Sequence, residues 1–130
     1  MTTRTPFPRV LGNAGLVQTT AGNDLLHTMS ILGPRSARLT KIMAYNNTGA
    51  NVTLQFGTLN RNPAGAAFVA LMPLFVAIDT LDNEWTEEEI PAVEWRSDTT
   101  PTAAGRTGDI YVLASAALVT IIIEVEEFGG

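Results

Sequence analysis

The sequence predicts an all-β protein, a single-domain antiparallel β-sandwich or jelly roll. Short apolar or alternating segments recur at spacings of roughly 8–15 residues, and Gly, Pro and Asn separate them. No segment carries the 3.6-residue periodicity of a long amphipathic helix. Regular short strands with turn signals between them are typical of sandwiches and jelly rolls, and 130 residues suffice for one such domain.

The first part of the chain predicts an extended N-terminal arm. Residues 1–23 are rich in Thr, Pro and Gly, and their apolar pieces are short. We expect an arm over these residues, with one short strand at residues 15–20, followed by the sandwich domain over residues 24–130. The first strand of that domain is expected within residues 24–32.

Two strands joined by a tight turn are expected next. Residues 37–45 have strand character, and residues 51–58 alternate apolar and polar side chains, as a half-buried strand does. Residues 46–50 contain two Asn and one Gly, which tolerate the positive φ of a tight reversal. We therefore expect the two strands to pair as a β-hairpin.

The segment from residue 66 to residue 78 has no polar face. It contains no charged residue, whereas a strand in a small antiparallel sheet normally turns one face to water. Pro73 cannot donate to a ladder and predicts a break within it. A strand that is apolar on both faces needs a second cover, which we expect another subunit to supply. The residues expected at this self-association contact are Phe68, Val69, Leu71, Leu74, Phe75 and Val76.

An acidic stretch follows over residues 79–89. Thr86 and Glu89 have capping-box spacing, and Pro91 limits the helix to about one turn. Both tryptophans lie among carboxylates, and aromatic residues dominate the centres of interfaces. Placement at the edge of the core and stacking on a sugar ring are the alternatives for them. The candidate partner-binding residues are Trp85, Glu87, Glu88, Glu89 and Trp95.

The remaining residues predict three strands. One is short, at residues 92–96, and a long polar loop over residues 97–108 separates it from strands at residues 109–114 and 117–127. In the last strand alternate residues are apolar throughout. Those expected to face the core are Val119, Ile121, Ile123 and Val125.

Charge is distributed unevenly along the chain. Residues 1–78 hold six basic residues and one carboxylate, whereas residues 79–130 hold two basic residues and twelve carboxylates. One interpretation is that both groups of charged side chains are solvated and become mixed on the surface when the chain folds. A molecule with a basic face and an acidic face, suited to head-to-tail contact in a ring or lattice, is the other. The basic residues are few and dispersed, so we expect no nucleic-acid binding.

No arrangement in the sequence predicts catalysis. The absence of cysteine excludes disulfides, thiolate metal sites and cysteine nucleophiles. The single histidine, His27, lies between Asp24 and Ser30, but offsets of three residues place both partners on the opposite face of a strand. The carboxylates of residues 79–84 are donors of the kind that calcium binds, without the spacing of a calcium loop. We expect no enzyme activity, no cofactor and no metal.

The sequence also predicts neither export nor membrane insertion. Residues 1–8 lack the apolar region of a signal peptide. The apolar stretches at residues 66–78 and 110–123 are shorter than the roughly 20 residues of a spanning helix. We expect them to be strands.

Several segments share a pattern with a known group of proteins. Residues 39–48 (LTKIMAYNNT), 52–57 (VTLQFG), 89–95 (EIPAVEW) and 108–112 (GDIYV) carry it. Over roughly residues 37–127 the chain resembles small β-sandwich virion proteins encoded near phage capsid genes. That resemblance implies a capsid decoration (cement) or head accessory protein, with no catalytic residues.

Together these observations predict a structural virion protein that self-associates and binds a capsid surface. We expect a homo-oligomer, with a trimer favoured, a major capsid protein as the partner, and a location in the virion or the cytoplasm of the host. The alternative is a small ligand- or carbohydrate-binding β-sandwich module that uses Trp85, Trp95 and the acidic stretch.

Overall fold

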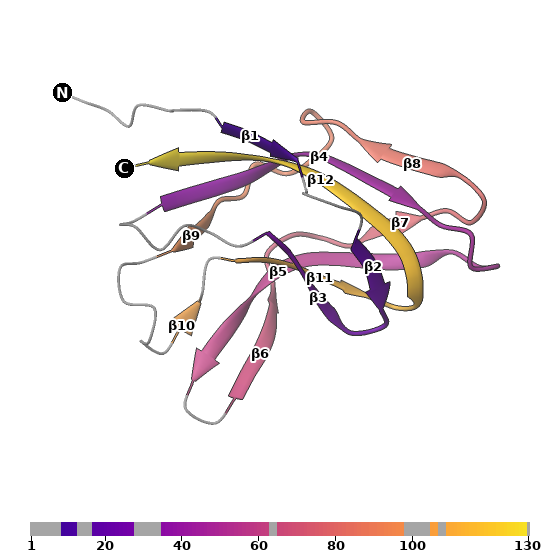
Figure 1. Cartoon of the computed structure of the whole chain (residues 1–130), viewed down its shortest axis with the longest axis horizontal. Helices are drawn as coiled ribbons and strands as arrows, with labels where there is room; N and C mark the ends of the chain where they lie inside the picture. The colour runs from indigo at the N-terminus through magenta and orange to yellow at the C-terminus, as the bar shows by residue number, and fades with distance from the viewer. Residues whose placement is uncertain are drawn as a thin grey trace.

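The computed structural model describes residues 9–12, 17–27, 35–62, 65–97, 105–106 and 109–129. Two antiparallel sheets pack face to face (Figure 1), which confirms the predicted β-sandwich. Within the described residues there is no helix. Sheet A contains β1 (Arg9–Gly12), β2 (Val17–Thr20), β4 (Arg35–Tyr45), β8 (Asp82–Trp85), β9 (Trp95–Ser97) and β12 (Ala117–Gly129). Sheet B contains β3 (Asn23–His27), β5 (Val52–Asn62), β6 (Gly65–Ala70), β7 (Phe75–Ala77), β10 (Gly105–Arg106) and β11 (Ile110–Ala114).

Each sheet is organised around one long strand. In sheet A, β12 pairs with β4 on one side and with β1 and β2 on the other. In sheet B, β5 lies between β11 and the pair β6 and β7. The alternation predicted for the last strand is confirmed, because the four residues expected to face the core are fully buried. They are Val119, Ile121, Ile123 and Val125.

Aromatic side chains join the two sheets in the core. Phe56 of β5 and Phe75 of β7 meet edge to face with ring centroids 5.5 Å apart. Phe75 in turn meets Trp85 of β8, across the sandwich, at 5.1 Å. Edge-to-face contacts of this kind add roughly 0.5–1.5 kcal/mol to the burial of the rings. The two edge-to-face contacts among Phe56, Phe75 and Trp85 therefore hold β8 of sheet A over β7 of sheet B.

The predicted hairpin between residues 37–45 and 51–58 is wrong. The two segments are strands, β4 and β5, but β4 belongs to sheet A and β5 to sheet B. The turn between them is an arch that carries the chain across the sandwich. The buried Asn46 side chain holds it: its amide donates to the carbonyls of Ala50 (2.9 Å) and Ala77 (2.8 Å), and its oxygen accepts the N–H of Thr48 (3.1 Å).

The structure also differs from the expected N-terminal arm. Arg9–Gly12 and Val17–Thr20 lie within the proposed arm, yet both hydrogen-bond to β12 as strands of sheet A. Their backbone groups complete the ladder that β12 leaves open on that side. The strand Val17–Thr20 also confirms the short strand expected within residues 15–20.

Gly57 occupies the tightest point of sheet B. A Cβ atom at this position would lie 2.0 Å from the carbonyl oxygen of Val69 and 2.9 Å from the Cα of Ala70. Its own carbonyl accepts the indole N–H of Trp95 at 2.8 Å. Because β6 crosses so close to the backbone of β5, only glycine fits there.

We expect Gly57→Ala to destabilise the fold by about 2 kcal/mol or more, because the added methyl forces the backbone of β6 away from β5. Gly22→Ala is the matched control, since the nearest heavy atom to its Cβ is a hydroxyl oxygen 3.8 Å away. Urea denaturation of the two variants measures the difference. Equal stabilities would contradict the close approach.

Candidate interaction surfaces

One edge of sheet B is formed by the apolar segment. We call β6, β7 and the linking residues 71–74 the apolar edge. Both strands pair with β5, and within the described residues no strand lies on their other side. Figure 1 shows β6 and the end of β5 extending beyond the body of the sandwich. The break predicted at Pro73 is confirmed, since β6 ends at Ala70 and β7 begins at Phe75.

Backbone geometry shows which groups of this edge are open. The N–H of Leu71 donates to the carbonyl of Phe56 at 3.0 Å. Donor direction alternates along an antiparallel strand, so the N–H groups of Phe68 and Ala70 point away from β5. A strand edge with open donors and acceptors is a template for pairing with another chain.

The six residues expected at the contact have different environments. Leu74 and Val76 are exposed, at 56% and 47%, whereas Phe68, Val69 and Leu71 are half-buried. Phe75 is only 8% exposed and belongs to the core, which corrects its assignment to an interface. Its burial follows from strand alternation, since Phe75 and Ala77 point inward and Val76 points outward.

Two further exposed residues extend this apolar surface. Ile78 and Leu81 are 47% and 50% exposed, and the N–H of Leu81 donates to the carbonyl of Ile78 at 3.4 Å. Leu81 lies inside the acidic stretch, and because its neighbours in the sequence are charged or polar, the sequence did not indicate that it belongs to an apolar surface. An apolar residue in a turn beside an apolar strand is the signal that could have found it.

Trp95 is not a surface residue. Its side chain is 1% exposed and its indole N–H donates to Gly57, so the expectation that it binds a partner is wrong. Trp85 is half-buried against the core, with its ring on Phe75. Both tryptophans lie on inward positions of their strands, which local sequence among carboxylates does not reveal.

The three glutamates after Trp85 have separate roles. Glu87 pairs with Arg38 at 2.6 Å, and Arg38 also contacts Glu126 at 3.0 Å. Glu89 accepts the N–H of Thr86 at 3.0 Å and its hydroxyl at 3.1 Å. The first of these bonds is one half of the capping box that the spacing predicts, and it closes a turn and not a helix. Glu88 is exposed.

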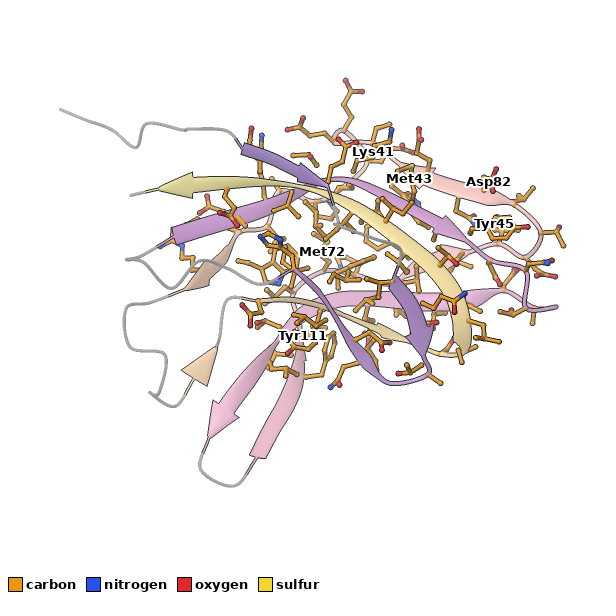
Figure 2. The ribbon with its side chains drawn as sticks, in the orientation of Figure 1. Lys41, Met43, Tyr45, Met72, Asp82 and Tyr111 are labelled. Carbon is orange, nitrogen blue, oxygen red and sulfur yellow. The ribbon has the colours of Figure 1, made fainter. Side chains whose placement is uncertain are left out.

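A groove of about 330 Å³ lies on the outer face of sheet A. Tyr45 stands beside Asp82 across the β4–β8 ladder (Figure 2). In the same ladder Met43 pairs with Glu84. Lys41 contacts Glu84 at 3.4 Å, whereas no ion pair of the described residues involves Asp82. The groove lining is Met43, Ala44, Tyr45, Asp82, Asn83, Glu84, Thr120 and Ile122.

His27 joins the two sheets. Its Nε2 lies 2.5 Å from Oε2 of Glu127 on β12, whose side chain is 5% exposed. Asp24, one of the residue types of a triad, accepts the N–H of Thr20 at 3.0 Å and its hydroxyl at 2.9 Å. Ser30 lies outside the described residues.

The acidic stretch does not form a metal site within the described residues. Asp79, Asp82 and Glu84 do not meet as a metal-binding cluster, and no other group of three carboxylates or histidines there does. Asp79 instead accepts the N–H of Gly49 at 2.9 Å, beside the arch. No helix there has the length and apolar composition needed to cross a bilayer.

Comparisons with known proteins give one similarity. No protein-family model and no curated protein matches the chain. A solved structure of Bacillus endospore appendages, described as a family of disulfide-linked pili, is similar over 98% of this chain and 90% of that one. Its sequence identity is 12% and its TM-score 0.48. The match is not to a phage protein.

We expect His27→Ala to lower the free energy of unfolding by about 1–3 kcal/mol, because it leaves the Glu127 carboxylate buried without its partner. In a Glu127→Leu background the same substitution should cost clearly less. Chemical denaturation of the four proteins completes the double-mutant cycle. Equal costs in both backgrounds would show that the two side chains do not interact.

Glu89 should titrate at a lower pH in the folded protein than in the unfolded chain. The N–H of Thr86, and then its hydroxyl, lower the pKa of Glu89 from its ordinary value of 4.5. The bonds therefore stabilise the turn above the unfolded pKa, and this contribution is lost as the pH falls through the folded pKa. Carboxyl ¹³C NMR measures both states, and Thr86→Val should reverse part of the shift. Identical titrations would refute the capping bonds.

Proposed function

We propose that this chain is a non-catalytic structural protein that self-associates through its apolar edge. The open backbone edge of β6 carries the proposal. Natural edge strands usually carry charges or prolines that block pairing, whereas Gly65–Ala70 contains neither. Two copies of the edge laid antiparallel satisfy the open N–H and C=O groups of both, with the two-fold symmetry common in homo-oligomers.

The exposed apolar side chains support the same contact. Leu74, Val76 and Ile78 follow β6 along the same side of sheet B, and a second copy paired on the edge covers them. Burial of apolar surface supplies the affinity, while the backbone pairing fixes the register.

At a finer level we propose a virion accessory role, with a capsid surface as the partner. The pattern shared with small phage virion β-sandwiches supports it. The alternative of a sugar-binding module loses a stacking residue, since Trp95 is buried. The trimer expected from the sequence stays a prediction that a mass measurement tests, and the two-fold edge contact proposed here gives a dimer in its place. The absence of any hydrolytic activity dependent on His27 also stays a prediction.

Two substitutions should lower the mass of the assembly measured by light scattering after size exclusion. Ala70→Pro removes an N–H that points away from β5, and Val76→Glu places a charge on the covered surface. Leu25→Glu is the matched control, because Leu25 is 44% exposed on β3, at the opposite edge of sheet B. Circular dichroism verifies folding. A monomeric parent protein at micromolar concentration, or an unchanged mass in both edge variants, would exclude this contact.

A further inference from the structure

The two ends of the sandwich differ in charge. At one end the β4–β5 arch, the turn before β8, the β2–β3 turn and the β11–β12 turn meet (Figure 1), and none of these segments contains an arginine or lysine. At the other end lie the start of β4, the end of β5, and β9 and β10. Four arginines occupy these strands. They are Arg35, Arg61, Arg96 and Arg106, and we call this the basic end.

Carboxylates near the basic end are already engaged. Glu127 is buried against His27, and Glu126 is held by Arg38. Glu94 contacts Arg96 at 3.6 Å, but the Arg96 side chain remains 72% exposed. The guanidinium group of Arg96 is therefore available to a neighbour.

The groove on sheet A has the chemistry to receive a guanidinium group. The Tyr45 ring is 50% exposed and can lie against its flat face, as in cation–π contacts. The Asp82 carboxylate, beside Tyr45, has no ion-pair partner among the described residues and can accept two N–H groups in parallel. Met43 and Ile122 supply apolar surface for the aliphatic stem of an arginine.

We propose that the groove binds an arginine from the basic end of a second copy, which gives a head-to-tail contact. This inference rests on the proposed structural role but uses a different surface. An antiparallel edge contact closes at two copies, whereas a head-to-tail contact continues as a chain or closes as a ring. The two contacts together would let the protein form an extended assembly.

The test is made in an Ala70→Pro background, which blocks the apolar edge without changing charge; Val76→Glu replaces it if that variant does not fold. Asp82→Asn should weaken the remaining self-association roughly tenfold or more, the effect of losing one charged hydrogen-bonded pair. Glu88→Gln, which removes an exposed carboxylate outside the groove, should leave it unchanged. Raising the salt to about 1 M should weaken it as well, because the screening length falls to about 3 Å.

Mixing two one-sided variants identifies the partner surface. Both variants are made in the same edge-blocked background. Asp82→Asn with Glu84→Gln removes the groove charge, and Arg35→Gln, Arg61→Gln, Arg96→Gln and Arg106→Gln together remove the basic end. Each should be monomeric alone, and an equal mixture should form heterodimers, since one intact groove then meets one intact basic end. A monomeric mixture, or no low-salt association in the edge-blocked parent, overturns the head-to-tail contact. If instead the edge substitutions do not change the mass of the assembly, the proposed contact through the apolar edge is wrong. The salt dependence and the mixing experiment then still test the contact through the groove.

Discussion

The sandwich depends on the buried amide of Asn46. At this residue the chain leaves sheet A and enters sheet B, and both strands on either side bury their apolar faces between the sheets. A chain that crosses a core must satisfy its backbone groups there. Asn46 does so by bonding Ala50 within the arch and Ala77 on β7. The same residue therefore positions β7, the strand that exposes Val76.

Local pattern predicted the strands well and their partners poorly. The alternation in β12, the break at Pro73 and the capping bond at Thr86 depend on neighbours within a few residues, and all three are present. Whether residues 51–58 pair with residues 37–45 or with β11 depends on contacts about sixty residues away along the chain. Turn chemistry at residues 46–50 is compatible with both, because a hairpin and an arch each reverse the chain.

The candidate surfaces show the same limit. The missing polar face of residues 66–78 was visible in sequence, and the structure places part of it on an open sheet edge. The groove was not predicted, because Tyr45, Asp82 and Ile122 come from three strands that only the sheet brings together. Trp95 was assigned to the surface since its neighbours are charged, yet its position on β9 points it at Gly57.

The order of pairing in sheet A has a consequence for synthesis. β12 hydrogen-bonds to β1, β2 and β4, all of which precede it by most of the chain. During translation β1 and β2 have no sheet partner until β12 leaves the ribosome, and β4 has only β8 and β9 to pair with before then. Such distant pairing also folds slowly. The β5–β6 pair is complete long before then, so its open edge is presented while sheet A is still unformed. Nascent chains on one message could therefore meet through that edge before either has a finished sandwich.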